Sequence, residues 1–188
     1  LAALGALWSE RPGCLMHSHL SEQVDEIAWV KDLVPHTRDY LDTYEEHGLV
    51  RDRAVFGHAI HLTPREIDRL ADSGASVVHC PTSNTFIGSG LFDMAHIAAQ
   101  RIPIGLTTDT GGGSSFSMLR TMAAAYEIGQ LRGTPTHAAQ LMWLATAGSA
   151  RSLHLHEKIG TLAEGFEADI TVLDLASTPA IKQRSDNA

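Results

Sequence analysis

Short apolar runs alternate along this chain with longer segments in which apolar residues recur at helical spacing. Buried strands of a parallel sheet give such runs, and amphipathic helices give the helical spacing. The runs predict four strands, at residues 14–20, 54–62, 76–80 and 102–107. Helices are predicted from residue 21 and over 39–47, 63–74, 91–100, 117–131 and 136–147, with a polar loop over 81–90. Strands that alternate with helices imply right-handed crossovers and a parallel sheet, so the fold class is α/β.

The clearest helix start in the chain is Thr63-Pro64-Arg65-Glu66. Thr63 is the predicted N-cap, Pro64 occupies the first helical position, and Glu66 completes a capping box. Gly74 is suited to end this helix because glycine adopts the left-handed conformation that follows many helices.

Four strand–helix units are half of an eight-stranded (β/α)8 barrel. An open half-barrel leaves two sheet edges and an apolar face without partners, so we expect the missing half to come from a longer sequence or from elsewhere. After about residue 155 a turn-rich segment leads to alternating apolar and polar residues at 169–175, typical of a half-buried strand. We therefore divide the chain into residues 1–155, half of the barrel, and residues 156–188, part of a small flanking β-sandwich domain.

Composition narrows the class of protein. The 188 residues are 44% hydrophobic and 19% charged, which is typical of a globular protein and not of a disordered one. The net charge is −8 and the 14 basic residues form no run, which argues against a nucleic-acid partner. No apolar run approaches the roughly 20 residues that span a bilayer, so we expect no membrane contact. Cys14 and Cys80 lie in apolar segments and are expected to be reduced core thiols of a cytoplasmic protein.

Polar side chains with catalytic chemistry stand at the ends of the predicted strands. His17, His19 and Glu22 follow the first apolar run, His58 lies in the second, and Asp109 comes just after the fourth. In a parallel barrel these strand ends converge on the face where the chemistry is placed. Imidazoles and carboxylates suit zinc, and a catalytic zinc keeps one position for water. The pattern therefore predicts a metal-dependent hydrolase that acts on a neutral or weakly charged small molecule.

These residues also have plainer interpretations. His19 would be a core residue bonded to a carbonyl group, and Glu22 a first-turn acid that complements the helix dipole. Glu22 can act as a proton shuttle only if it is partly buried. Asp109 would cap a helix or form a turn, and Gly111–Gly113 after it would let the backbone approach a ligand closely.

Three further residues are placed less directly by the pattern. We expect His79 near the active face and His61 in a structural role. Gly88-Ser89-Gly90 lies in a loop and lacks the spacing of a serine nucleophile.

Taken together, the motifs resemble the metal-dependent amidohydrolase superfamily over about residues 14–175. The segments that carry the resemblance are His-Ser-His-Leu-Ser-Glu (17–22), Gly-His-Ala (57–59), His-Cys-Pro-Thr-Ser-Asn (79–84), Thr-Asp (108–109) and Gly-Thr-Leu-Ala-Glu-Gly-Phe-Glu-Ala-Asp (160–169). The last segment is similar to the return into the family's β-sandwich. Asp109, its Gly-rich turn and the Ser-Phe-Ser-Met-Leu at 115–119 resemble the guanine-deaminating branch more than other members.

The resemblance implies a role for each matching residue. His19 and Asp109 would bind one zinc ion, with iron as an alternative, and His19, Glu22 and Asp109 would contact a purine substrate. Glu22 would be the proton shuttle, His58 would orient and polarise the attacking water, and Asp109 would take a proton from that water. The implied enzyme is a homodimer that hydrolyses guanine to xanthine and ammonia.

One family motif is missing from these 188 residues. The family's first metal pair, a His-x-His after the first barrel strand, should lie upstream, and His17-x-His19 is not that pair because Leu-Ser-Glu follows it. The chain thus resembles the second half of the barrel, and alone we expect it to hold zinc poorly and to be inactive. Two alternatives stay open: an amidohydrolase acting on a triazine, pterin or adenosine-like ring, and a non-catalytic assembly protein that lost the metal.

Overall fold

The computed structural model describes residues 1–186 and contains one sheet of four parallel strands in the order β1-β2-β3-β4. The strands are β1 (Met16–Leu20), β2 (Ala54–His58), β3 (Ser76–His79) and β4 (Ile104–Leu106). The predicted parallel α/β fold is confirmed, and each strand is shorter than its apolar run. β2 ends at His58 because His58 and Ala59 adopt left-handed backbone conformations, with φ values of 68° and 50°.

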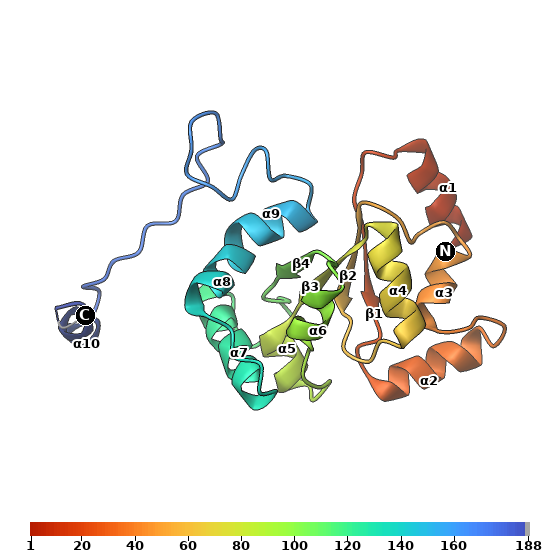
Figure 1. Ribbon diagram of the computed structural model, residues 1–188, viewed down its shortest axis with the longest axis horizontal. Coiled ribbons are helices and arrows are strands. Elements are labelled where there is room, and N and C mark those ends of the chain that lie inside the picture. Colours follow the sequence, from red (N-terminus) through yellow and green to blue (C-terminus); the bar gives the residue numbers. More distant parts are fainter. Residues whose placement is uncertain (187–188) are drawn as a thin grey trace.

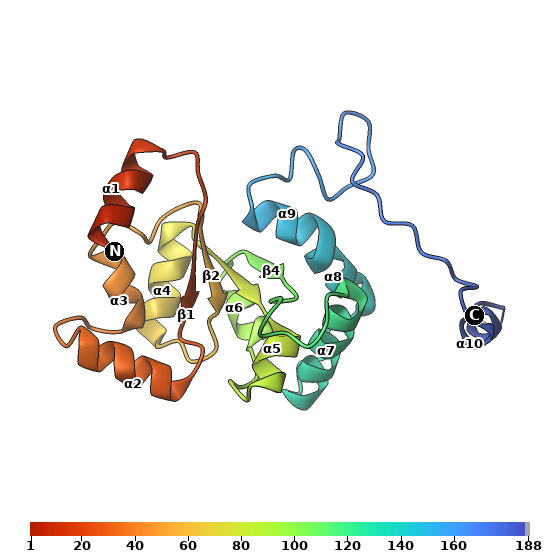
Figure 2. The same ribbon diagram turned by 180° about the vertical axis from the view of Figure 1, so that it is seen from behind.

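Helices connect and follow the strands. They are α1 (Ala2–Glu10), α2 (Val24–Leu33), α3 (Tyr40–Glu45), α4 (Pro64–Ser73), α5 (Pro81–Phe86), α6 (Met94–Ala99), α7 (Met118–Leu131), α8 (Ala138–Trp143), the π-helix η1 (Leu144–Gly148), α9 (Ser149–Ser152) and α10 (Pro179–Ser185). Figures 1 and 2 show them in chain order around the sheet, from α1–α4 at one end to α7–α9 at the other. Within residues 1–186, none of these helices combines the length and the apolar content that a membrane crossing requires.

The helix start predicted at Thr63 is confirmed. The Thr63 side chain accepts a hydrogen bond from the backbone N–H of Glu66, and the Glu66 carboxylate accepts one from the N–H of Thr63 at 2.7 Å. Gly74 follows α4 with a φ of 74°, the left-handed conformation expected of a glycine C-cap. The core forms beside this helix, where Leu70 of α4 shares a fully buried cluster with Leu20, Phe56 and Val77 of the sheet.

The N-terminal helix α1 was not predicted from the apolar pattern. Its Trp8 is buried, donates an indole N–H to the carbonyl of Cys14 at 2.8 Å, and lies 3.8 Å from the guanidinium of Arg51. Both cysteines are free, but only Cys80 is buried. The expectation of a core thiol is therefore wrong for Cys14, which lies at the surface just before β1.

Two secondary-structure predictions were wrong. Residues 81–90 do not form a loop throughout, because α5 begins at Pro81, which takes the first-turn position that tolerates proline. The helix predicted over 136–147 is interrupted by η1. There the ring of Trp143 lies so close to Gly148 that a Cβ atom at that glycine would be 2.8 Å from it.

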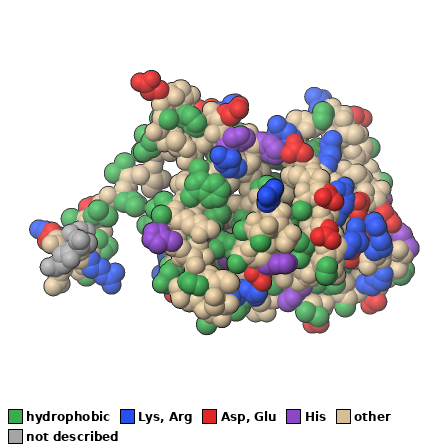
Figure 3. All heavy atoms as spheres, viewed as in Figure 1, with side chains coloured by type: hydrophobic (Ala, Val, Ile, Leu, Met, Phe, Trp, Pro, Cys, Tyr) green, Lys and Arg blue, Asp and Glu red, His purple; other side chains and the backbone are tan. Residues whose placement is uncertain are grey.

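The strand predicted at 169–175 does not form in the described residues. The chain after α9 is irregular and exposed up to α10, and Figures 1 and 2 show it running away from the sheet. Figure 3 shows apolar side chains along this tail, where Val172 is 87% exposed. A strand needs a neighbouring strand for its backbone hydrogen bonds, and in the described residues the four strands of the sheet pair with one another. The assignment of 156–188 to a β-sandwich stays a prediction, and residues 187–188 lie outside the described residues.

Candidate active site

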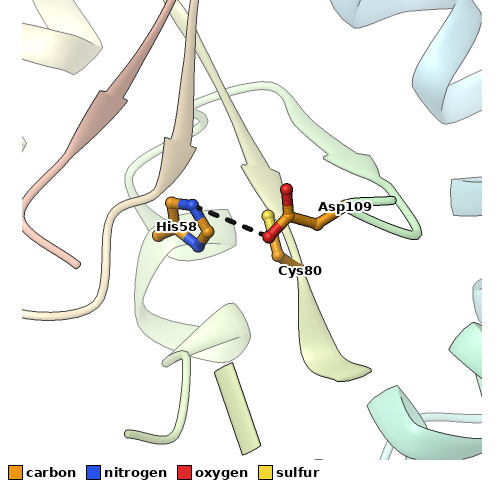
Figure 4. Close-up of side chains that lie close together, drawn as sticks. All are labelled: His58, Cys80 and Asp109. Atoms are coloured by element: carbon orange, nitrogen blue, oxygen red, sulfur yellow. Dashed lines mark ion pairs between the residues drawn. The ribbon is translucent and has the colours of Figure 1, made fainter. Parts of the chain in front are cut away.

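The carboxyl ends of the strands bring together the four residues that the sequence singled out. The imidazole rings of His19, from β1, and His58, from β2, stack with centroids 5.2 Å apart and planes 12° apart. His58 Nδ1 lies 3.4 Å from Glu22 Oε1, and His58 Nε2 lies 4.0 Å from Asp109 Oδ2, as Figure 4 shows for the second pair. The centroid of the His17 ring lies 6.3 Å from that of the His19 ring.

Strained backbone marks the same place. Four of the seven non-glycine residues with positive φ in the described chain lie here, namely Ser21 (47°), His58 (68°), Ala59 (50°) and Asp109 (49°), and the other three are Arg53, Arg101 and His154. Such conformations cost of order 1–3 kcal/mol each and concentrate at functional sites, where the surrounding structure holds them. The strain thus lies where the strand ends turn their side chains toward one another.

The glycines after Asp109 permit the turn that carries it. A Cβ atom on Gly113 would lie 1.9 Å from the carbonyl oxygen of Thr108, and one on Gly112 would lie 3.0 Å from Asp109 Oδ2. Any larger side chain at Gly113 would therefore collide with the backbone of the turn. These glycines shape the loop around the carboxylate.

Hydrogen bonding fixes the tautomer of His58, which is 2% exposed. Its Nδ1 faces two acceptors, Asn84 Oδ1 at 2.8 Å and Glu22 Oε1 at 3.4 Å. Two acceptors require that Nδ1 carries the hydrogen, and it donates that hydrogen to Asn84. The lone pair of the neutral ring is then on Nε2, which faces Asp109. Asn84 was missed as a site residue because residues 81–90 were predicted to be a loop.

Glu22 is not the first-turn acid of α2. That helix begins at Val24, and the capping role belongs to Glu26, whose carboxylate accepts the backbone N–H of Gln23 at 3.2 Å and of Glu22 at 2.9 Å. The side chain of Glu22 is only 15% exposed and accepts a hydrogen bond from the Ser89 hydroxyl at 2.9 Å. The structure therefore meets the requirement that a proton-shuttling Glu22 be partly buried. The predicted start of α2 at Ser21 was three residues too early.

A cavity of about 300 Å³ opens beside these groups. His19, His58 and Asp109 border it together with apolar residues of the sheet, namely Leu15, Val55, Val78 and Leu106. Cys80 also borders it, and burial raises the pKa of its thiol to about 12, so the thiol stays protonated. The polar groups thus lie at the carboxyl ends of the strands, whereas the apolar residues continue along the sheet face that a closed (β/α)8 barrel fills with side chains.

The other two histidines have structural contacts. His61 bonds through Nε2 to the carbonyl of Ser89 at 2.8 Å, as its predicted structural role requires. His79 is 1% exposed, and its ring stacks on Phe92 with centroids 4.7 Å apart. His79 is the last residue of β3 and so lies at the carboxyl end of the sheet, as expected, but its ring packs against Phe92, whereas the next residue, Cys80, borders the cavity.

The donor set fits a metal ion. With the hydrogen of the His58 ring on Nδ1, as the bond to Asn84 requires, Nε2 and the Asp109 carboxylate are acceptors that face each other across 4.0 Å. Such an arrangement is favourable when a cation or a water lies between the two groups. One ligand atom each from His58, Cys80 and Asp109 lies within 4.8 Å of the others, and the ring of His19 lies against that of His58. Imidazole nitrogen and carboxylate oxygen are common zinc ligands.

Several known proteins are similar to this chain in sequence and in fold. The family model described as "Amidohydrolase family" matches residues 2–188. Guanine deaminase of Escherichia coli K12 is 42% identical over the whole chain, which covers 43% of that protein, and the solved structure of the E. coli enzyme matches with a TM-score of 0.98 over the same shares. The chain thus spans less than half the length of these relatives.

Two more distant structures carry ligands. Guanine deaminase from C. acetobutylicum, solved with guanine in the active site, is 28% identical with a TM-score of 0.81 over 88% of this chain and 40% of that one. An adenosine deaminase from Xanthomonas campestris with bound zinc is 27% identical with a TM-score of 0.82 over 92% of this chain and 40% of that one. The strands, the residues at their carboxyl ends and the near-complete family match agree, and the chain belongs to the amidohydrolase family.

Proposed function

We propose that this chain is the second barrel half of a zinc-dependent guanine deaminase, which converts guanine and water to xanthine and ammonia. The observation that carries the proposal is the contact of His58 with both Glu22 and Asp109 at the strand ends, 3.4 Å and 4.0 Å away. The 42% identity to the E. coli guanine deaminase supports this substrate.

His19 and Asp109 would hold the zinc, together with ligands from the other half of the barrel. The bound zinc supplies an activated water for attack on the ring carbon that bears the amino group. The zinc-bound adenosine deaminase of the same fold supports this metal, and iron is the alternative.

His58, Asp109 and Glu22 each bind or transfer a proton in the proposed reaction. His58 Nε2, fixed as an acceptor by the bond from Nδ1 to Asn84, accepts a hydrogen bond from the attacking water and orients it. Asp109 takes a proton from that water, and Glu22 delivers a proton to the ring nitrogen beside the attacked carbon. A second proton transfer to the amino group lets ammonia leave.

The site suits an uncharged purine. Hydrogen-bonding groups of His19, His58 and Asp109 lie together at the strand ends, where the edge of a purine ring can contact them. An amidohydrolase acting on another amino-substituted ring would use the same proton chemistry, and the two differ only in which ring is turned over. We further propose that the protein is cytoplasmic and a homodimer. Size-exclusion chromatography with light scattering would test the homodimer.

The decisive experiment uses the complete reading frame that contains this chain. Conversion of guanine to xanthine is followed by absorbance, before and after treatment with a chelator and after addition of zinc. We expect guanine turnover that the chelator abolishes and added zinc restores. In Asp109→Asn, kcat should fall by about 100-fold or more. Stoichiometric zinc without guanine turnover would overturn guanine as the substrate. Neither zinc nor turnover would favour the non-catalytic assembly protein.

A further inference from the structure

The Gly88-Ser89-Gly90 turn lacks the spacing of a serine nucleophile motif. It follows α5 and contacts the candidate site through Ser89. Ser89 is 5% exposed, and its hydroxyl donates a hydrogen bond to Glu22 Oε1 at 2.9 Å. Ser89 and Glu22 are 67 positions apart in sequence, so this contact depends on the tertiary fold.

We propose that Ser89 is a positioning residue that holds the Glu22 carboxylate by Oε1 and leaves Oε2 to carry the proton. The inference rests on the proposed function of Glu22 as a proton shuttle. Both polar contacts of the Glu22 carboxylate involve Oε1: the Ser89 hydroxyl at 2.9 Å and His58 Nδ1 at 3.4 Å. In residues 1–186 no hydrogen bond or ion pair to Oε2 is present.

The backbone of Ser89 is itself fixed on both sides. Its N–H donates to the carbonyl of Asn84 at 2.8 Å, and its carbonyl accepts from His61 Nε2 at 2.8 Å. Gly88 and Gly90 have φ values of 75° and 135°, which glycine adopts without strain. The hydroxyl is thus presented from a rigid turn, as pre-organised support of a catalytic group requires.

The turn also connects the two proton-handling groups. Asn84 accepts the bond from His58 Nδ1 through its side chain and the bond from Ser89 through its backbone. A displacement of α5 would therefore move the supports of Glu22 and His58 together. Without the Ser89 bond, the Glu22 side chain would regain rotamer freedom and spend less time in the position that delivers a proton.

The test compares Ser89→Ala with a matched control, Ser76→Ala, in the full-length enzyme. Ser76 is also a buried serine with a hydrogen-bonded hydroxyl, but it lies at the start of β3, where it bonds to the carbonyls of Ala54 and Ser152 and does not contact Glu22, His58 or Asp109. We expect S89A to lower kcat by about 10- to 100-fold with little change in KM, zinc content or melting temperature, because the bond supports a proton transfer and not substrate binding. S76A should keep wild-type kcat, and Ser89→Thr, which retains a hydroxyl, should recover most of the activity.

A second measurement does not depend on turnover. In protein labelled with carbon-13 glutamate, the Glu22 carboxylate signal, assigned with Glu22→Gln, should move in S89A and stay in place in S76A. A kcat of S89A within about twofold of wild type would overturn the proposal, as would equal losses in the two alanine variants. If the wild-type enzyme does not turn over guanine, the proposed function fails, and the carbon-13 signal alone decides: an unmoved signal overturns the role of Ser89.

Discussion

At the residue scale, one buried amide determines what His58 can do. The Asn84 side chain is fully buried, and its Oδ1 accepts the hydrogen of His58 Nδ1 at 2.8 Å. If that acceptor were lost, the weaker contact with Glu22 Oε1 at 3.4 Å would be left to hold the hydrogen on Nδ1, and a hydrogen on Nε2 would present a donor to Asp109 in place of a lone pair. The chemistry at Nε2 therefore depends on a side chain that does not face Asp109 itself.

We expect Asn84→Ala to lower kcat for guanine by about 10- to 100-fold in the full-length enzyme, the range found when supports of this kind are removed. Thr85→Ala is the matched control, since Thr85 lies on the same helix and its hydroxyl donates to helix carbonyls, those of Pro81 and Thr82. Steady-state kinetics at saturating guanine decides between them. Wild-type kcat in N84A would show that His58 keeps its tautomer without Asn84.

His79 makes folding sensitive to acid. Burial lowers its pKa to about 3 in the folded protein, whereas an unfolded histidine has a pKa near 6.5. At a pH between these two pKa values the unfolded state binds one more proton than the folded state. The free energy of unfolding is therefore not reduced by His79 above about pH 6.5, and it falls on acidification by at most about 1.4 kcal/mol per pH unit. Melting temperatures from pH 7 to pH 4.5 should therefore fall less steeply in His79→Leu than in wild type. The exposed His96 offers the control His96→Leu, and equal slopes in both variants would contradict the assignment to His79.

The residues of the site were predictable to different degrees. His19, Glu22, His58 and Asp109 were predictable because each follows an apolar run, and parallel strands bring their carboxyl ends together. Asn84 and Ser89 were not, since they act through contacts across 26 and 67 positions that depend on how α5 lies against the sheet. Pro81 was the available signal, because a proline after a strand is well placed to start a helix.

At the scale of elements, Glu66 ties three segments to the site. Its Oε2 caps α4 through the N–H of Thr63 at 2.7 Å, and its Oε1 accepts the N–H of Leu41 in α3 at 3.0 Å. The hydroxyl of Ser21, between β1 and Glu22, also reaches Oε1, at 3.4 Å. The capping box was predictable from four adjacent residues. The buried contacts to α3 and to Ser21 were not, because they join segments 25 and 45 positions away.

Glu66→Gln should therefore destabilise the protein by about 2 kcal/mol, since one carboxylate oxygen becomes an amide group that opposes a backbone donor. The exposed Glu127 of α7 provides the control Glu127→Gln, which should stay within about 0.5 kcal/mol of wild type. Urea unfolding of both variants measures the difference. An unchanged midpoint for E66Q would mean that the Ser21 turn and the two helices are held by other contacts.

At the scale of the whole molecule, the sheet is open at β1 and at β4. At the β1 edge, His19 remains exposed although it is a predicted zinc ligand. On the helices, large apolar side chains such as Phe86 of α5 and Leu131 of α7 are both 73% exposed. Because the chain covers 43% of its E. coli relative, the rest of a barrel of that kind would close these edges and supply further metal ligands.

Expressed alone, residues 1–188 should therefore bind zinc weakly, show no guanine turnover and self-associate through their exposed apolar surface. Only His19 and Asp109 of the expected ligand set lie in this chain, and two ligands leave the ion mostly hydrated. Zinc content after gel filtration, light scattering and the absorbance assay would be compared with the complete reading frame at equal concentration. Asp109→Asn in the complete protein is the control for zinc that is bound elsewhere. Stoichiometric zinc and turnover in the isolated 188 residues would show that the site is already complete at the carboxyl ends of these four strands.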